Sequence, residues 1–383
     1  MNYDVAVVGA GVFGAWTAYQ LRLQGASVAL LDAYGPGNSR ASSGGESRVI
    51  RLGYGPDQIY SHSAEKSLQM WQQLFEKREH CSNLFQKTGV LWLAREQDDY
   101  CEAVLKTLQQ LGANYERLDH DELVRRFPQL EFGPIAWGIL EPDMGVLMAR
   151  RAVQAVVTQG RADGLEYLEE AIAPPSMEAN ELHSIKTISG KEIVAEGFVF
   201  ACGPWLPKLF PDLLGDLIHV TKQEVFFIGV PPGDENFNLG RLPVWIDFTD
   251  LVYGIPNLDS RGFKLAIDAH GPEFDPDSGE RVVSESGLKA ARNYLAQRMP
   301  LLANAPVTET RVCQYENTSN GDFLIDRHPM FENVWLVGGG SGHGFKHGPA
   351  VGQYVAEVMF GRGKSEPRFS LASKGRVRER TVY

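Results

Sequence analysis

The sequence predicts an α/β (α+β) fold with two domains, one of which is assembled from separate parts of the chain. The chain has 383 residues, whereas a single core stops growing at about 250–300 residues. The N-terminus reads as strand, tight turn, helix and strand, and strand-and-turn patterns return at 197–210 and 333–361. Between them, 87–140 and 221–312 carry alternating strand patterns and two helical ones, which predicts a mixed sheet with flanking helices.

The N-terminal pattern, residues 4–32, contains GxGxxG between two apolar strands. Gly9 permits the tight turn, Gly11 lets the backbone approach a pyrophosphate at the helix N-terminus, and Gly14 lets helix and strand pack closely. Asp32 ends the second strand, where a carboxylate can accept a hydrogen bond from a ribose hydroxyl. The pattern predicts dinucleotide binding, and a glycine turn without a ligand is the alternative.

The wide separation of the remaining pieces bears on which dinucleotide is expected. The segment 197–210 reads as a buried strand and a small-residue turn, and 333–361 as a strand, a glycine-rich turn and a helix. A nucleotide domain built from N-terminal, middle and C-terminal pieces favours a flavoprotein over a dehydrogenase with a contiguous NAD domain.

Composition excludes several classes of partner. The net charge of −11 at pH 7 argues against nucleic acid and against an anionic membrane surface. No segment reaches the roughly 18 consecutive apolar residues of a membrane span. The cysteines, at positions 81, 101, 202 and 313, form no CxxC pair and no metal-ligand spacing. We therefore expect a cytoplasmic protein with reduced thiols and no metal.

Longer motifs accompany the glycine pattern over essentially the whole chain. They include GGESRVIRLGYGPDQIYSHSAEKSLQMW (44–71), EPDMGVLMARRAV (141–153), GFKLAID (262–268), VCQYENTSNGDFLID (312–326) and GGSGHGFKHGPAVG (339–352). With these motifs the chain resembles the D-amino-acid-oxidase-like flavoprotein superfamily, and within it the branch of monomeric sarcosine oxidase, N-methyltryptophan oxidase and pipecolate oxidase. The SRxIR, CxY and SGHGFK elements are specific to that branch.

The resemblance implies FAD as the cofactor and a division of the chain into two domains. The FAD-binding domain would be discontinuous and Rossmann-like, formed by 1–86, 141–220 and 313–383. The substrate-binding domain would carry the mixed sheet and be formed by 87–140 and 221–312.

Cys313 of the CxY motif is implied as the attachment point of the flavin, through a thioether to its 8α-methyl group. The thiolate is the reactive form of cysteine, and Arg311 is a candidate to favour it. From spacing alone, an isolated cysteine packed in a core is the alternative. The expected cofactor site comprises Gly9, Gly11, Gly14, Asp32, Ser42, Ser43, Arg48, Cys313, Gly342, Gly344, Phe345 and Lys346.

Arg51 and Lys346 are implied as the ligands of the substrate carboxylate. A guanidinium offers a planar fork that a carboxylate accepts in two hydrogen bonds. Arg48 is the alternative to Arg51, and either arginine could instead form a surface ion pair. The amides of 342–345, expected where a helix begins, should face the pyrimidine end of the flavin, where negative charge develops on reduction.

Lys264 in GFKLAID matches the lysine that promotes oxygen reduction in this branch. A cation about 4 Å from developing superoxide contributes about 4 kcal/mol at an effective dielectric of about 20, or roughly a thousandfold in rate. A solvated surface lysine is the alternative. Tyr253 and Tyr315 match aromatic walls of the substrate pocket, and ordinary strand aromatics are the alternative for both.

The sequence departs from the branch at two places. A histidine pair expected just before the SRxIR element is replaced by Ser43 and Gly44. A histidine expected four residues after Lys264 is Asp268, and His270 follows two residues later. Both changes put sarcosine itself in doubt. Asp268 would suit a cationic or larger amine if it lies near the pocket, and a solvent-facing carboxylate is the alternative.

The predicted function is an FAD-dependent amine oxidase acting on a secondary, N-substituted (N-methyl or N-carboxymethyl) or cyclic amino acid. A hydride equivalent would pass to the flavin, the imine would hydrolyse, and O2 would be reduced to H2O2. The expected partners are the small substrate and O2, and the expected state is a monomer. The alternatives are a flavin-dependent dehydrogenase with another acceptor and a non-catalytic flavin-binding subunit.

Overall fold

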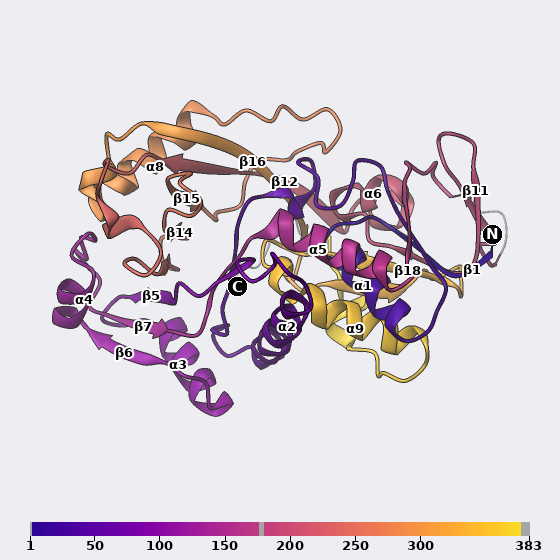
Figure 1. Ribbon diagram of the computed structural model, residues 1–383, viewed down its shortest axis with the longest axis horizontal. Coiled ribbons are helices and arrows are strands. Elements are labelled where there is room, and N and C mark those ends of the chain that lie inside the picture. The colour runs from indigo at the N-terminus through magenta and orange to yellow at the C-terminus, as the bar shows by residue number, and fades with distance from the viewer. Residues whose placement is uncertain (1, 176–179, 377–383) are drawn as a thin grey trace.

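The computed structural model describes residues 2–175 and 180–376. Figure 1 shows two parts side by side, one around strands β1, β11 and β18 with helices α1 and α9, the other around β5–β7 with α3, α4 and α8. Helix α2 (Gln58–Glu76) lies near the middle of this view.

A seven-stranded sheet gathers the N-terminal, middle and C-terminal segments that the sequence predicts to combine. β1 pairs in parallel with β11 on one side and β2 on the other, and β18 pairs in parallel with β11. The predicted discontinuous Rossmann-like fold is confirmed. The strands are β1 (Asn2–Val8), β2 (Val28–Asp32), β9 (Glu166–Glu169), β10 (Ser184–Lys186), β11 (Glu192–Phe200), β17 (Leu324–Arg327) and β18 (Val334–Gly338).

Helices α1 (Val12–Leu23) and α9 (Gly348–Met359) pack against each other beside this sheet. Gly352 permits the close approach, because a Cβ there would lie 2.5 Å from the carbonyl carbon of Trp16. The ring of Trp16 meets that of Trp71 edge to face at 5.0 Å, which joins α2 to the same core. Helix α5 (Ala149–Ala162) also packs on α1.

The second sheet has eight strands in the order β16-β12-β15-β14-β13-β5-β7-β6. All its pairs are antiparallel except β13 with β5, so the predicted mixed sheet is confirmed. Its elements are β5 (Val90–Ala94), β6 (Glu116–Asp119), β7 (Trp137–Glu141), β12 (Ile218–Ile228), β13 (Val244–Asp247), β14 (Val252–Ile255), β15 (Phe263–Ile267), β16 (Val307–Thr318), α3 (Asp99–Leu111), α4 (His120–Arg126) and α8 (Glu285–Arg298).

The long strands β12 and β16 pair from Ile218–Thr318 to Ile228–Val307. The boundaries predicted after residues 220 and 312 fall inside these two strands, and the division into domains stays a prediction. The remaining elements are a three-stranded sheet of β3 (Arg48–Ile50), β4 (Phe85–Gln86) and β8 (Gly145–Leu147), and the short helices α6 (Leu206–Leu209) and α7 (Pro211–Leu214).

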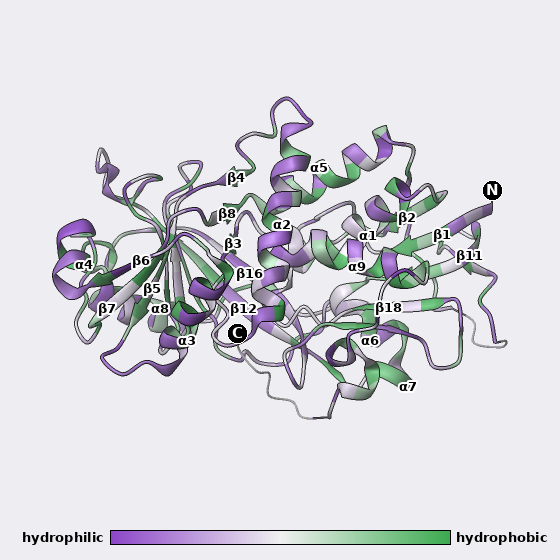
Figure 2. Cartoon of the chain, turned by 90° about the horizontal axis from the view of Figure 1, so that it is seen from below, coloured by the Kyte–Doolittle hydropathy of each residue, from purple (hydrophilic) through white to green (hydrophobic). Residues whose placement is uncertain are grey.

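Hydropathy follows this architecture. Figure 2 shows hydrophobic residues along much of β1 and β2, and mainly hydrophilic residues on α4 at the other end of the molecule. Within residues 2–175 and 180–376, no helix has both the length and the apolar character needed to cross a bilayer.

Candidate functional site

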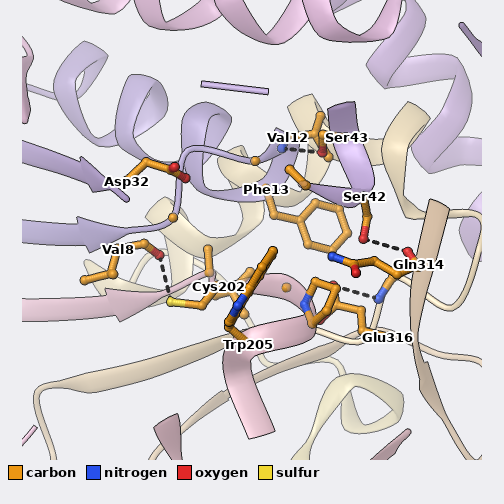
Figure 3. A pocket seen from close by; sticks show the side chains of 18 of the residues that line it. Val8, Val12, Phe13, Asp32, Ser42, Ser43, Cys202, Trp205, Gln314 and Glu316 are labelled. Carbon is orange, nitrogen blue, oxygen red and sulfur yellow. Dashed lines mark hydrogen bonds between the residues drawn. The ribbon is translucent and has the colours of Figure 1, made fainter. Parts of the chain in front are cut away.

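A cavity of about 380 Å³ opens where the parallel strands β1, β2, β11 and β18 end. Figure 3 shows part of its lining, which comes from the start of α1, from the turn after β11 and from β16. Among the residues predicted to form the site, those that line this cavity are Gly9, Gly11, Asp32, Ser42, Ser43, Arg48, Tyr315, Gly342, Gly344 and Phe345.

The glycine turn is shaped as its sequence predicts. Gly9 has a φ of 101°, in the region that favours glycine, and an added Cβ at Gly14 would lie 1.8 Å from the Gly9 carbonyl oxygen. Gly14 therefore acts through packing and not through the cavity wall. The Asp32 carboxylate accepts the Ala10 N–H at 2.7 Å, and Ser43 Oγ accepts the Val12 N–H at 3.0 Å. Burial raises the pKa of Asp32.

Arg48 is the cation in contact with Cys313. Arg48 Nη2 lies 3.2 Å from Cys313 Sγ and donates to the Ser42 carbonyl at 2.8 Å. Arg311 pairs with Glu46 at 2.8 Å but lines the same small space as Cys313, so its help to the thiolate stays a prediction. Cys313 lines a separate space of about 20 Å³ that shares Arg48 with the large cavity.

A second cavity, of about 90 Å³, adjoins the first and shares Arg48, Tyr315, Gly342 and Phe345 with it. It brings together the predicted carboxylate ligands and the predicted aromatic walls. Its lining includes Arg51, Tyr253, Asp268, Tyr315 and Lys346.

Arg51 is buried against aromatic rings, which rules out the surface ion pair. Its guanidinium lies 4.2 Å from the ring centroid of Tyr54 and 4.7 Å from that of Trp92, and it donates to the Gly53 carbonyl. Behind it, the Glu141 carboxylate accepts the Leu52 N–H and the Trp92 indole N–H, both at 2.8 Å. Burial raises the pKa of Glu141.

Lys346 is buried beside Arg51, and its ammonium donates to neutral acceptors. Nζ donates to the Tyr54 hydroxyl at 2.8 Å and to the His343 carbonyl at 3.0 Å. His347 Nε2 lies 2.7 Å from the same hydroxyl. Burial, and next the charge of Arg51, lower the pKa of Lys346 well below its usual value.

The helical stretch expected at 342–345 begins at Gly344, as a 3₁₀ turn with His343 as its N-cap. This 3₁₀ segment spans Gly344–His347, and α9 starts at Gly348. Ser341 and Gly342 have φ values of 43° and 82°, which no helical residue adopts, so the helix cannot extend back to them. Gly342, Gly344 and Phe345 nevertheless line the large cavity.

Lys264 is buried, which excludes the solvated alternative. Its Nζ donates to the Ser47 carbonyl at 2.9 Å and to the Ser47 hydroxyl at 3.2 Å. It lines the small space together with Arg48 and Cys313, not the large cavity. Burial, and next the charge of Arg48, lower the pKa of Lys264 well below its usual value.

The two places where the sequence departs from the pattern of the branch lie near different cavities of the site. Ser43 lines the large cavity, and an added Cβ at Gly44 would lie 1.8 Å from the Asn38 carbonyl oxygen. Asp268 lines the second cavity and is half-buried, so it does not simply face solvent. His270 is exposed and lines neither cavity.

Glu316 is a site residue that the sequence analysis missed. It lines the large cavity, is 7% exposed, and accepts the Gly340 N–H with Oε1 at 3.4 Å. Its Oε2 has no hydrogen-bond partner among the described residues. Burial raises its pKa to about 7. Its position directly after Tyr315, in the same motif as Cys313, was the signal that could have found it.

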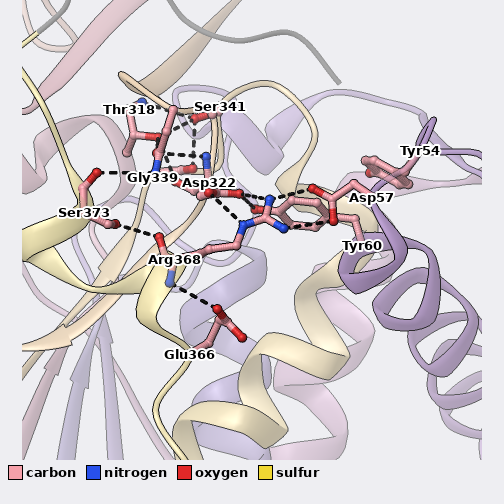
Figure 4. Close-up of polar contacts among 12 residues, drawn as sticks. Tyr54, Asp57, Tyr60, Thr318, Asp322, Gly339, Ser341, Glu366, Arg368 and Ser373 are labelled. Carbon is pink, nitrogen blue, oxygen red and sulfur yellow. Dashed lines mark hydrogen bonds and ion pairs between the residues drawn. The ribbon is translucent and has the colours of Figure 1, made fainter. Parts of the chain in front are cut away.

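The segment after α9 contributes Arg368 to a cluster of polar contacts with Asp57 and Asp322, which Figure 4 shows. The Arg368 guanidinium pairs with Asp57 at 2.5 Å and with Asp322 at 2.6 Å. Asp322 also accepts the Tyr60 hydroxyl at 2.8 Å, and the ring of Tyr60 lies 5.4 Å from that of Tyr54. Arg368 thus connects residues beyond α9 to the wall behind the second cavity.

Known proteins resemble this chain over nearly its full length. The family described as FAD dependent oxidoreductase matches residues 4–358. Monomeric sarcosine oxidase from Bacillus sp. is 30% identical over 98% of this chain and 96% of its own. N-methyl-L-tryptophan oxidase from Salmonella heidelberg is 27% identical over 97% of both chains. The crystal structure of L-proline dehydrogenase from P. horikoshii has a TM-score of 0.82 at 20% identity and 97% coverage of each chain, a likeness of fold.

Proposed function

Because this chain belongs to the FAD dependent oxidoreductase family, we propose that it oxidises N-substituted or cyclic amino acids at the carbon beside the amine, with O2 as the acceptor. The family and the full-length relatives named sarcosine oxidase and N-methyl-L-tryptophan oxidase make it an FAD-dependent oxidoreductase. The observation that carries the proposal is the placement of Arg51 and Lys346 in one cavity that adjoins the large one.

The residues of the large cavity fit FAD. Gly9 and Gly11 of the glycine turn line this cavity, and neither has a side chain that would cover the backbone there. Asp32 would accept hydrogen bonds from the hydroxyls of the adenosine ribose. Glu316 offers a buried oxygen without a partner among the described residues, and the ribityl hydroxyls would supply the donor it lacks.

FAD, when bound, takes up two electrons and a hydrogen from the substrate carbon and passes them on to an acceptor. Arg51 and Lys346 would hold the carboxylate and so orient that carbon. Their charges also lower the pKa of a nearby substrate ammonium, which favours the neutral amine. The neutral amine can be oxidised directly, so no strong base is required.

The overall reaction balances with oxygen and water. The substrate loses two electrons and two protons to form an imine, water hydrolyses the imine to a carbonyl compound and an amine, and O2 gains the two electrons and two protons as H2O2. Lys264 would stabilise the anion formed from oxygen, on the side of the site where it lies with Arg48 and Cys313.

Cys313 would hold the cofactor covalently. Its thiolate sulfur would bond to the flavin 8α-methyl carbon, which loses one hydrogen, and the two electrons released would leave to O2 as H2O2. The contact between Arg48 Nη2 and Cys313 Sγ at 3.2 Å supports this, because a guanidinium favours the thiolate.

An anaerobic titration tests the reaction class. The purified protein is mixed with N-methyl, N-carboxymethyl and cyclic amino acids, each paired with the same amine lacking its carboxylate, and the loss of flavin absorbance is followed. We expect bleaching by at least one amino acid and by none of the decarboxylated partners. In Lys346→Met the amino acid should bleach the flavin only at much higher concentration. A protein without flavin, or one that no amino acid bleaches, contradicts the proposal.

The acceptor and the covalent bond need separate measurements. Mixing the reduced protein with O2 should restore the flavin absorbance within the turnover time and yield one H2O2 per flavin. Slow reoxidation that a quinone accelerates would favour the dehydrogenase instead. Acid precipitation should leave the flavin with the protein, and Cys313→Ala should release it. The monomeric state and the cytoplasmic location stay predictions, and light scattering checks the first.

A further inference from the structure

The second cavity carries an acidic group in addition to its two cations. Asp268 follows β15 directly, and its N–H donates to the Leu251 carbonyl at 2.6 Å, which fixes it beside the β13–β14 turn. Phe248 and Leu251 of that turn line the same cavity. The carboxylate therefore lies next to an apolar surface, with the carboxylate-binding cations in the same space.

Asp268 acts on groups inside the cavity and not only on solvent. It shifts the pKa values of Tyr253 and Lys346 upward, although burial is the larger influence on each. The other carboxylate in the lining, Asp247, is fully buried and committed to the protein, because it pairs with Arg298 at 3.1 Å and with Arg95 at 3.2 Å.

The proposed reaction gives Asp268 no task at the reacting nitrogen. An anion beside that nitrogen would favour its protonated form, and the protonated amine is not oxidised. A half-buried carboxylate beside an apolar wall instead suits a cation on a short apolar stem.

We propose that Asp268 binds a second positive charge on the substrate, so that the preferred substrates are N-substituted amino acids with a cationic side chain. This inference rests on the proposed amine oxidation. The substrate carboxylate would contact Arg51 and Lys346, the side-chain methylenes would contact Phe248 and Leu251, and the distal ammonium would contact Asp268. A hydrogen-bonded charge pair of this kind favours the cationic substrate by about ten- to a hundredfold in kcat/KM.

The test compares substrates that differ only in the distal charge. The α-N-methyl derivatives of 2,4-diaminobutyrate, ornithine and lysine are each paired with the analogue in which the terminal ammonium is absent. For the wild type we expect at least a tenfold preference in kcat/KM for the cationic member of one pair. Asp268→Asn should remove that preference, mainly through KM for the cationic substrate, and leave the neutral analogue within about threefold. Asp268→Glu should restore part of it.

His270→Asn serves as the matched control, because His270 is exposed and lies two residues beyond without lining the cavity. It should leave both members of each pair unchanged. Equal rates for both members of every pair in the wild type would overturn the inference, as would an equal loss on both in Asp268→Asn. In either case the neutral analogues would still be oxidised, so amine oxidation would stand. If no member of any pair bleaches the flavin, both proposals fail.

Discussion

Two lysines of this site are buried, and burial weakens the hold of each on its proton. Lys264 and Lys346 are 3% and 5% exposed, and the pKa of each lies well below its usual value because of burial and a neighbouring arginine. An arriving anion reverses that effect, since a negative charge nearby raises the pKa of an ammonium. Both lysines are therefore suited to binding anions that come and go, rather than to permanent ion pairs.

For Lys264 this reasoning predicts a pH-dependent reaction with oxygen. Only the protonated form attracts developing superoxide, so the reoxidation rate should fall as pH rises through the lowered pKa, below the usual lysine value of 10.5. Lys264→Met should slow reoxidation by roughly a thousandfold and remove this pH dependence. Stopped-flow mixing of reduced protein with O2 measures both. Unchanged reoxidation in Lys264→Met would exclude the role, and the substrate-reduction rate provides the internal control.

Glu316 predicts a pH-dependent stability of the cofactor-free protein. Its pKa is about 7 in the folded protein, against the usual 4.5 of an exposed glutamate in the unfolded chain, so the folded protein holds the proton more tightly. The free energy of unfolding then falls as pH rises from 4.5 through 7, because the buried carboxylate of Glu316 is costly in the folded state and not in the unfolded chain. Glu316→Gln should therefore have a free energy of unfolding up to about 3 kcal/mol higher than that of its parent at pH 8, and little different at pH 5.

Calorimetry of the two proteins in a Cys313→Ala background, freed of flavin, checks this. A difference in Tm that does not change between pH 5 and pH 8 would contradict the assignment of the titrating group to Glu316. With FAD restored, the same substitution should weaken cofactor binding, because an amide keeps one acceptor oxygen but loses the charge.

At the scale of elements, the segment after α9 connects two distant parts of the chain through one arginine, Arg368. Arg368 binds Asp57, which precedes α2, and Asp322, which precedes β17. Asp322 is 4% exposed, so removing its partner leaves a buried carboxylate short of hydrogen bonds. Figure 4 shows how this one side chain holds the two segments together.

Arg368→Gln should therefore destabilise the protein by about 1–3 kcal/mol and lower its Tm by a few degrees. Arg376→Gln is the matched control, because Arg376 is 81% exposed in its side chain and lies 3.8 Å from Asp216, and such pairs contribute little. Thermal denaturation of the two variants measures the contrast. If both lose the same amount, the Arg368 contacts do not stabilise the fold as proposed.

Local patterns explain which elements the sequence predicts well. The strands at 4–8 and 27–32 and the helix between them follow from the glycine pattern and from apolar runs, and all three are present. The helix expected near Gly342 begins as a 3₁₀ turn at Gly344 and becomes α-helical at Gly348, because Ser341 and Gly342 have positive φ values that a right-handed helix does not allow.

The residues of the site also divide into those that local patterns predict and those that they do not. Motifs predict Arg51, Lys346 and Tyr253 as site residues, and the structure brings them to one cavity. Glu141 opens the motif EPDMGVLMARRAV, but the motif assigns it no role, because that role depends on contacts with residues about fifty and ninety positions earlier in the chain. Sequence spacing carries no information about such contacts. Residues that hold the site residues in place are therefore harder to predict than the site residues themselves.

At the scale of the whole molecule, the nucleotide sheet depends on the last part of the chain. β18 begins at Val334 and lies between β11 and β17, and α9 packs on α1. A chain ending at residue 332 keeps the whole glycine pattern but lacks an inner strand and a covering helix. We predict that it retains no FAD, as measured by the flavin absorbance of the purified fragment, whereas a chain ending at residue 376 does.

The position of β18 in the sequence also determines when the nucleotide-binding sheet can be completed during synthesis. The glycine turn is synthesised long before β18, so α1 remains uncovered on the ribosome until α9 follows. We therefore expect FAD to bind only after β18 and α9 have been synthesised.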